Sequence, residues 1–369
     1  MIHTALQQLI VERIRDKGPI TFAEYMRMAL YEPGYGYYVS GPTRVGWEGD
    51  FYTSTDVGSF FANCMGRQLQ QMWEQLGKPT PFTVLEQGAG RRQLAQGIQE
   101  WAQQEAPALA SALDYHTSDI QSGQDALTTT SDDIAPRVIL SNELVDAFPV
   151  HIVEVRSSKL YEVYVDIRDG RPGESLGEPS NESVARYLDD HHIPWRTYGD
   201  GWRAEINLAA RSWMHSIASM LTGPNNKRKR RGFLLTIDYG DKARSLYTPY
   251  RRHGTLATYF RHQMTDQPLA RPGEQDITAH VNFSALIDEG RRRDLRLHTF
   301  TTQREWLTSM GLFEELERIR ERDFAIIDRD RASDQGQIAL LQWYNLRQRA
   351  MALTDPAGMG SFKVLIMRR

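Results

Sequence analysis

The chain has 369 residues, and its 44 basic and 47 acidic side chains leave a formal charge of -3. So balanced a charge argues against nucleic acid or an anionic membrane as the main partner. Hydrophobic residues make up 40% and charged residues 25%, which indicates a soluble globular protein and excludes a disordered or fibrous chain. The length fits roughly two domains or one α/β domain with a large insertion, and we favour the second.

The chain contains a single cysteine, Cys64, which excludes an internal disulfide and argues against a thiolate-rich metal site. Because Cys64 lies among apolar positions of a predicted helix, we expect a buried, inert thiol. Residues 1–17 have apolar side chains at helical spacing and no signal-peptide pattern. No segment approaches the roughly 20 apolar residues of a membrane span. We therefore expect a cytoplasmic protein.

The N-terminal region combines two predicted helices with two loops. Thr21, followed three residues later by Glu24, forms a capping-box pattern that predicts a second helix through Leu30. The sequence YEPGYGYY, residues 31–38, then predicts turns with four tyrosines, either an aromatic-stapled loop or a wall of a substrate pocket. The sequence GDFYTSTDVG, residues 49–58, either caps the apolar helix predicted at 59–76 or presents hydroxyls and amides to a polar ligand.

A glycine-rich turn follows the first predicted strand of an α/β sheet. Residues 82–96, FTVLEQGAGRRQLAQ, read as strand, turn and the start of a helix that extends to about Glu105, which begins a βαβ unit. Further strands are predicted at 113–118, before Asp119, and at 137–140, before SNELVD at 141–146. Polar residues therefore gather at the carboxyl edge of the sheet, where open α/β sheets bind ligands.

The pattern then departs from simple βα alternation. Residues 151–167 alternate as a hairpin or meander, and glycines and prolines at 170–179 predict a loop. The basic run at 223–231 predicts a charged loop. Between these lie predicted helices at 184–193 and 209–221 and an extended segment at 205–208.

The core pattern resumes with a buried strand at 232–240 that contains Asp238. A polar stretch, PGEQDITAHVNF at 272–283, follows. The remaining predicted elements are strands at 295–300 and 362–367 and helices at 303–310, 315–322 and 335–352.

The residues around the glycine turn favour S-adenosylmethionine over a dinucleotide. A dinucleotide site needs a third glycine to cradle pyrophosphate, and Arg92 occupies that position. S-adenosylmethionine has no phosphate and carries a cationic amine, which the carboxylate of Glu86 would suit. Asp119, at the end of the next strand, would accept hydrogen bonds from ribose hydroxyls. The alternative is that Glu86 and Asp119 are strand-end or capping residues and the turn is only a connection.

Seven motifs in the same order together resemble one family, the MidA-like S-adenosylmethionine-dependent methyltransferases, which include a mitochondrial complex I assembly factor that methylates a protein arginine. They are YEPGYGYY, GDFYTSTDVG, LEQGAGRRQL, SNELVDAFPVH, IDYG, PGEQDITAHVNF and GMGSFKVL. The resemblance implies a class I methyltransferase, an α/β fold with a Rossmann-like seven-stranded sheet whose last strand is antiparallel. It also implies N-terminal helices, an inserted α+β region over the active site, and a protein substrate such as a respiratory-complex or other assembly subunit.

This resemblance divides the chain into four regions. Residues 1–80 form an N-terminal helical region with substrate and cofactor loops, and 81–150 form the first half of the core. Residues 151–231 form the inserted region. Residues 232–369 complete the core and contain an acceptor-site loop at 272–283.

By the same resemblance, cofactor positions are assigned to Glu86, Gly88, Gly90, Asp119, Gly49, Asp50 and Asn142. Arg92 departs from the family pattern, which has glycine there. If the position requires positive φ, arginine would cost of order 1 kcal/mol or more and could crowd the cofactor. A non-catalytic assembly or binding protein is therefore the alternative function, and a dinucleotide oxidoreductase is a distant third.

Methyl transfer from a sulfonium needs alignment rather than a metal or a covalent nucleophile. An arginine acceptor arrives charged, with a pKa above about 12, and requires carboxylates. Glu143 and Asp146 are the predicted pair, and the NEL sequence resembles the acidic loop of arginine methyltransferases that form symmetric dimethylarginine. Otherwise Glu143 serves the cofactor or the loop, and Asp146 fixes a turn. Further candidates, each with a structural alternative, are His280 as a base or substrate contact, Asp276 and Thr278 in the acceptor site, and Asp238 lining the site or capping a strand.

Overall fold

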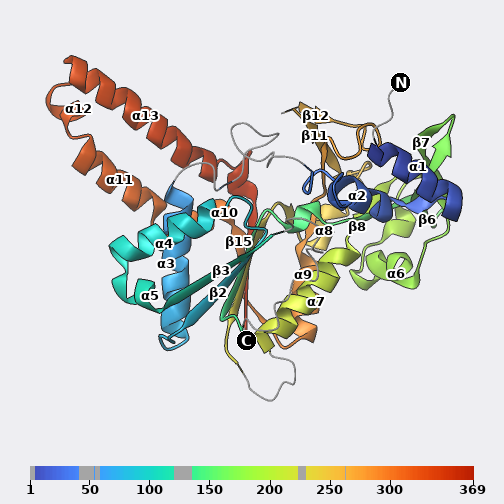
Figure 1. The fold of residues 1–369 in the computed structure, drawn as a ribbon, viewed down its shortest axis with the longest axis horizontal. Helices are drawn as coiled ribbons and strands as arrows, with labels where there is room; N and C mark the ends of the chain where they lie inside the picture. Colours follow the sequence, from blue (N-terminus) through green and yellow to red (C-terminus); the bar gives the residue numbers. More distant parts are fainter. Residues whose placement is uncertain (1–4, 41–53, 55–58, 120–134, 223–229, 262) are drawn as a thin grey trace.

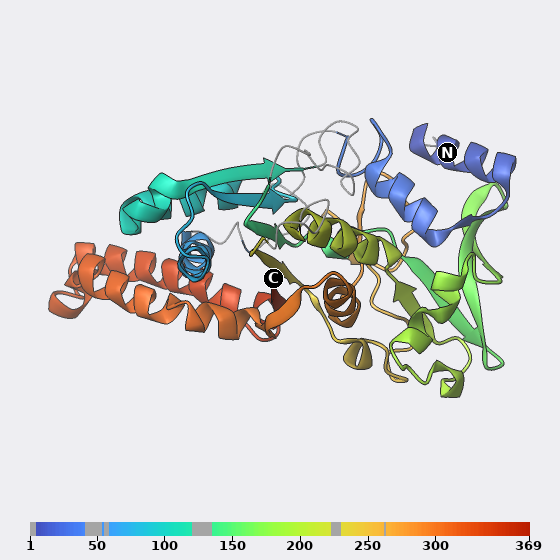
Figure 2. The same cartoon turned by 90° about the horizontal axis from the view of Figure 1, so that it is seen from below.

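The computed structural model describes residues 5–40, 54, 59–119, 135–222, 230–261 and 263–369. Two lobes lie side by side, each built on its own sheet, and a helical arm extends from the lobe that contains β2 and β3 (Figure 1). The arm and the second lobe lie at opposite ends of the molecule in both views (Figure 2).

The first lobe contains a sheet to which the described residues contribute six strands. The central strands pair in parallel, whereas β16 pairs antiparallel with both of its neighbours. The antiparallel last strand confirms the class I prediction, whereas the described residues form six strands of the seven expected. The strand order is β15 (Arg296–Thr302), β16 (Lys363–Arg368), β9 (Phe233–Asp238), β4 (Val138–Asn142), β2 (Phe82–Gln87) and β3 (Leu113–Ser118).

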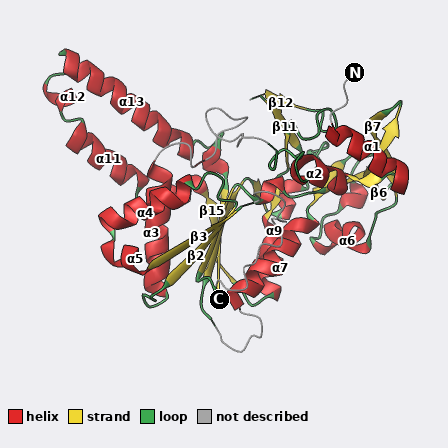
Figure 3. Cartoon of the chain, in the orientation of Figure 1, coloured by secondary structure: helices red, strands yellow, loops and turns green. Residues whose placement is uncertain are grey.

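Helices cover both faces of this sheet (Figure 3). Side chains of a strand alternate between its faces. Leu140 accordingly packs with α3, α4 and α10, whereas its neighbour Ile139 packs with α7 and α9. The helices are α3 (Ser59–Gln75), α4 (Gln93–Glu105), α5 (Pro107–Ala112) and α10 (Gln303–Ser309) on one face, and α7 (Leu208–Thr222) and α9 (Phe283–Arg292) on the other. Cys64 is fully buried in α3, as expected, and burial raises the pKa of its thiol to about 11.

The second lobe is built on an antiparallel sheet in the order β1, β6, β5, β8, with β7 also paired to β6. The predicted loop at 170–179 is wrong, because Arg171–Gly177 forms β7. This strand pairs only with β6, and an edge strand tolerates Pro172 and two glycines. The strands are β1 (Ile20–Thr21), β5 (His151–Arg156), β6 (Lys159–Arg168), β7 (Arg171–Gly177) and β8 (Arg203–Ile206).

The N-terminal helices pack against this second sheet. Leu6, Ile10 and Ile14 of α1 (Ala5–Lys17) share a buried cluster with Ile152 and Val163 of the sheet. Helix α2 (Phe22–Tyr31) begins at its predicted cap, where the Thr21 hydroxyl accepts the Glu24 amide hydrogen at 3.1 Å. Helices α6 (Glu182–Asp190) and α8 (Ala243–Leu246) pack with the other face.

Residues 240–282 form two smaller sheets. Strands β12 (Gln263–Thr265), β11 (Ala257–Phe260) and β13 (Asp276–Thr278) form one, and β10 (Gly240–Asp241) and β14 (Val281–Asn282) form the other. Strand β13 also reaches the core, because the Ala279 amide donates to the Asp146 carbonyl at 2.9 Å. The segment at 272–283 therefore joins the two lobes.

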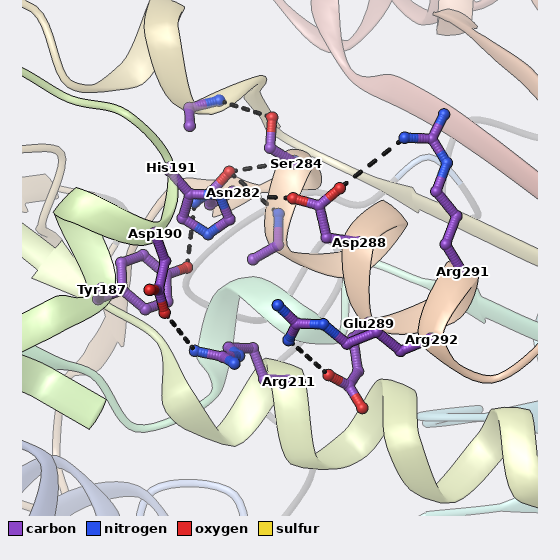
Figure 4. Close-up of polar contacts among 12 residues, drawn as sticks. Tyr187, Asp190, His191, Arg211, Asn282, Ser284, Asp288, Glu289, Arg291 and Arg292 are labelled. Atoms are coloured by element: carbon purple, nitrogen blue, oxygen red, sulfur yellow. Dashed lines mark hydrogen bonds and ion pairs between the residues drawn. The ribbon is translucent and has the colours of Figure 1, made fainter. Parts of the chain in front are cut away.

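A polar network joins α6 of the second lobe to α7 and α9 of the core (Figure 4). The Asn282 side chain, which caps α9, donates to the Tyr187 hydroxyl at 3.1 Å, and Arg211 lies 3.9 Å from Asp190. These contacts hold the second lobe against α7 and α9, the helices that cover one face of the core sheet.

Three helices form the arm: α11 (Leu312–Asp323), α12 (Ile326–Arg329) and α13 (Asp334–Thr354) (Figure 1). The two long ones confirm the helices predicted at 315–322 and 335–352. Among the described residues, no helix combines the length and the apolar character that crossing a bilayer requires.

Candidate functional site

The glycine turn after β2 adopts left-handed conformations at alternate residues, with φ of 71° at Gly88, 48° at Gly90 and 61° at Arg92. The Gly88 amide donates to the Ser118 carbonyl at 2.9 Å, which holds the turn against the end of β3. A Cβ atom on Gly88 would lie 2.9 Å from Cδ1 of Leu144, whereas one on Gly90 would meet no described atom within 4 Å. The backbone is therefore open at Gly90, where a ligand can approach it.

Two carboxylates flank this turn. Glu86 is buried and accepts a hydrogen bond from the Tyr115 hydroxyl at 2.9 Å. Burial raises the pKa of Glu86 to about 7, despite that hydrogen bond, and the charge of Asp119 raises it further. Asp119 accepts a hydrogen bond from the Gly90 amide. Glu86, Gly90 and Asp119 thus meet at one point of the sheet edge, as the sequence predicted.

Glu143 follows β4 with a φ of 49°, which is rare for a residue with a side chain. Its Oε1 accepts hydrogen bonds from the Ser54 amide at 2.9 Å and from the Asn142 side chain at 3.0 Å. Oδ1 of Asn142 is buried without a partner among the described residues. Burial raises the pKa of Glu143 to about 7, and the charge of Asp146 adds to this.

Asp146 lies in the short 3-10 helix η2 (Val145–Ala147) and is buried. Its Oδ2 accepts from the Tyr239 hydroxyl at 2.5 Å, while Oδ1 has no partner among the described residues. Burial raises the pKa of Asp146 to about 6. Asp238 accepts the amide hydrogens of Val145 and Asp146 at 2.9 and 3.2 Å, so its carboxylate caps this turn.

Two tyrosines of the N-terminal region contact the segments that carry Asp146 and Asp276. The rings of Tyr31 and Tyr38 stack with centroids 5.7 Å apart. The Tyr31 hydroxyl donates to the Ala147 carbonyl, and the Tyr38 hydroxyl donates to Asp276, both at 2.7 Å. The sequence YEPGYGYY therefore holds two of its tyrosines against η2 and β13, and a role as a pocket wall stays a prediction.

Tyr31 connects the two groups of carboxylates. Burial, and then nearby negative charges, hold the pKa of Tyr31 well above its ordinary value. Those charges belong to Asp276, Asp146 and Asp119. The phenol is thus near enough to the acids of both groups for their charges to act on it.

His280 and Thr278 occupy different positions around this site. Thr278 is buried in β13. It directly precedes Ala279, whose amide donates to the Asp146 carbonyl. His280 is exposed, and its ring meets Tyr239 edge-on at 5.3 Å between centroids. Desolvation of the ring and the charge of Arg251 lower the pKa of His280 to about 4. The role of His280 as a base or a substrate contact stays a prediction. Gly49 and Asp50 lie outside the described residues.

A family model described as "Putative S-adenosyl-L-methionine-dependent methyltransferase" matches residues 64–301, more than half of the chain. The chain belongs to this methyltransferase family. Among its relatives, the mitochondrial protein arginine methyltransferase NDUFAF7 of Rattus norvegicus is 26% identical over 401 residues, which covers 97% of this chain and 82% of the rat protein. A Drosophila melanogaster homologue is 25% identical over 319 residues, covering 77% and 69%.

A crystal structure of a Burkholderia thailandensis protein bound to S-adenosyl-homocysteine shares the fold of this methyltransferase. Its TM-score is 0.79 at 26% identity, over 99% of this chain and 92% of that one. A native crystal structure from the same organism gives a TM-score of 0.75 at 26% identity, over 99% and 91%. The cofactor is therefore S-adenosylmethionine, as the turn sequence predicted.

The residues present fit that cofactor. The backbone is open at Gly90, which admits a ligand, and Asp119 lies at the same turn for the ribose hydroxyls. Glu86 places a buried carboxylate on the same edge for the cationic amine. When bound, the cofactor supplies a methyl group on a sulfonium, which needs no further activation.

Arg92 occupies a position that does require positive φ, so the arginine carries conformational strain of about 1 kcal/mol. Its side chain is exposed at the start of α4. The energetic cost of Arg92 comes from its backbone conformation. Because its side chain is exposed, it leaves room for the cofactor at Gly90. The sequence analysis named Arg92 as a position of possible strain, and its φ of 61° shows that the backbone there is left-handed.

The sequence analysis missed three residues that hold the site acids. The hydroxyls of Tyr115 and Tyr239 donate to Glu86 and Asp146, and the Ser54 amide donates to Glu143. Tyr115 is in β3, paired beside β2, and Tyr239 directly follows β9. A systematic search for hydrogen-bond donors at strand positions next to predicted site acids would have found both tyrosines. Ser54 lies 89 residues from Glu143 in the chain, and we find no local signal for that contact.

Proposed function

We propose that this methyltransferase transfers the methyl group of S-adenosylmethionine to an arginine side chain of a protein. One observation carries the proposal: Glu143, Asp146 and Asp238 lie at one edge of the sheet without a cationic partner. No described lysine or arginine forms an ion pair with any of the three. Buried charges are ordinarily paired, so this group is suited to a cation that comes from outside.

A guanidinium matches this site better than an ammonium does. It presents five donors in a planar fork, and Oδ1 of Asp146 is an unused buried acceptor. The stacked rings of Tyr31 and Tyr38 supply an aromatic surface on the same side, which attracts a flat cation.

The chain's own residues would orient the acceptor and manage its charge. Asp146 would bind one edge of the guanidinium while Tyr239 holds the carboxylate in place. Glu143, with a pKa raised by burial to about 7, is matched to taking the proton that the guanidinium releases. Its φ of 49° is the kind of backbone strain that persists where surrounding contacts fix a functional residue.

The relatives named protein arginine methyltransferases support a protein substrate. A subunit of a respiratory or other assembled complex remains our prediction for its identity. A cytoplasmic location also remains a prediction, whereas those relatives are named as mitochondrial. Fractionation of cells that express a tagged chain would decide between the compartments.

The test uses S-adenosylmethionine with a labelled methyl group and a lysate of the source cells. We expect label on arginine residues of a protein, mapped by mass spectrometry, and strong loss of labelling in Glu143→Gln and Asp146→Asn. Label on a small molecule, on another residue type, or at wild-type levels in both variants would contradict the proposal.

A non-catalytic assembly protein is the second candidate, favoured by the strained Arg92. Calorimetry separates the two functions. Binding of S-adenosylmethionine to the wild-type chain at micromolar concentration supports the enzyme. Binding that is absent at millimolar concentration, and restored by Arg92→Gly, would support the second candidate.

A further inference from the structure

The helical arm exposes an apolar surface that nothing in the described chain covers. Ile338, Leu341 and Tyr344 of α13 are 56%, 65% and 47% exposed. With Met351, they account for four of the nine exposed large hydrophobic side chains of the described residues. The opposite side of α13 packs inward through Ala339, Ala350 and Leu353 and through Trp343, so the helix is firmly attached.

The apolar residues lie on one face of α13, and polar residues flank them in a definite order. At 3.6 residues per turn, eight residues fall within an arc of about 120°: Asp334, Gln337, Ile338, Leu341, Tyr344, Asn345, Gln348 and Ala352. Arg349 borders that arc. We call these residues the α13 face. Along the helix, this face has an acid at its start, apolar and amide side chains through its middle, and Gln348, Arg349 and Ala352 at its end.

The acidic start of this face would lie opposite its basic end if a second copy of α13 packed against it in the antiparallel direction. Asp334 lies seven residues before Leu341 and Arg349 lies eight residues after it, or about 10 and 12 Å at 1.5 Å per residue. An antiparallel pair of α13 helices centred near Leu341 would therefore place Asp334 of each copy beside Gln348 and Arg349 of the other. Neither Asp334 nor Arg349 forms an ion pair with another described residue.

We infer that the α13 face binds a second copy of this chain, in an antiparallel two-fold pair centred near Leu341. A two-fold contact requires one self-complementary patch, and the α13 face has that pattern in both its apolar and its charged residues. Figure 1 shows the arm projecting away from the sheet edge that holds the site, so pairing would leave the site accessible.

Cross-linking of the full chain tests the symmetry directly. Leu341→Cys lies within one turn of the proposed axis, so oxidation should yield a covalent dimer. Met264→Cys, on β12 and 72% exposed in the wild type, is the matched control and should remain monomeric. Equal yields from both variants, or no dimer from Leu341→Cys, would overturn the inference.

Light scattering with charge exchange tests the same pair in solution. The wild type should have twice the monomer mass, and Leu341→Asp should weaken association at least roughly 100-fold, with unchanged helix content by circular dichroism. Asp334→Arg and Arg349→Asp should each weaken it about threefold to tenfold, while the double variant recovers the wild-type value. A wild-type monomer at about 100 μM, or a dimer unaffected by Leu341→Asp, would contradict the inference.

Discussion

The site has two halves that differ in how the chain builds them. The cofactor half consists of Glu86, the turn from Gly88 to Arg92, and Asp119 on the adjacent strand. The acceptor half gathers side chains from five separate stretches. They are Tyr31 at the end of α2 with Tyr38 beyond it, Glu143 and Asp146 after β4, Tyr239 after β9, Asp276 in β13, and Ser54.

This difference separates the tasks of the two halves. The cofactor half needs local backbone geometry, which a short sequence can specify through glycines and one acid. The acceptor half needs buried charge without a resident cation, and only distant segments packed together can exclude water from it. Substitutions should therefore affect one half and spare the other.

Asp146→Asn should have the largest effect. Removing this buried charge should lower methyl transfer about 100- to 1,000-fold, because a guanidinium would lose its charged partner. Affinity for S-adenosylmethionine, measured by calorimetry, should stay within about twofold of wild type. Glu182→Gln, on the exposed face of α6, serves as the control. A parallel loss of cofactor binding would show that the halves are not separable.

Lowering the pH should stabilise the ligand-free protein. Burial raises the pKa of Glu86 and of Glu143 to about 7 and that of Asp146 to about 6, from ordinary values of 4.5, 4.5 and 3.8. The folded state then binds more protons than the unfolded state between about pH 4.5 and 7. A shift of this size is worth about 3 kcal/mol for each group, so the free energy of unfolding should fall by several kcal/mol as the pH rises through that range.

Urea denaturation at several pH values measures this trend. Glu143→Gln should flatten the pH dependence that comes from the acceptor half, and Glu86→Gln the part from the cofactor half. Stability that rises with pH in the wild type would contradict the prediction.

Glu86→Gln should weaken cofactor binding about 10- to 50-fold, because the amine would lose a carboxylate in a buried setting. Tyr115→Phe, which removes the hydroxyl that holds Glu86, should weaken it less, by about threefold. Calorimetry on both variants gives the comparison. Glu86→Gln with wild-type affinity would remove Glu86 from the cofactor site.

Arg92→Gly should have the smallest effect. Relief of positive-φ strain favours the variant by about 1 kcal/mol, and the extra freedom of glycine in the unfolded chain offsets part of this. The melting temperature should rise by roughly 1–2 °C. Ala89→Gly, next to the left-handed position, is the matched control and should lower it. A drop in Arg92→Gly would mean that the arginine side chain makes a stabilising contact.

The sequence alone determined most of the core elements. Strand β3 and helices α3, α7 and α13 lie within about two residues of their predictions, although the apolar pattern of β3 is weak and α13 also exposes apolar side chains. The sequence did not predict β7. Pro172 and two glycines are typical of a loop, and the pairing with β6 that makes this segment a strand leaves no local sequence signal. Strand β1 is only two residues long and gives no periodic signal.

For the candidate site, the sequence predicted the glycine turn and the strand-end acid Glu86, because the left-handed turn at Gly88 and Gly90 is a local requirement; their roles toward the cofactor stay predictions. It also located the strain at Arg92 for the same reason. Only the tertiary structure decided the acceptor half. The contacts of Tyr31 with Ala147, of Tyr38 with Asp276 and of Tyr239 with Asp146 span 116, 238 and 93 residues. Such contacts form through burial of the whole core, and no short stretch of sequence encodes them.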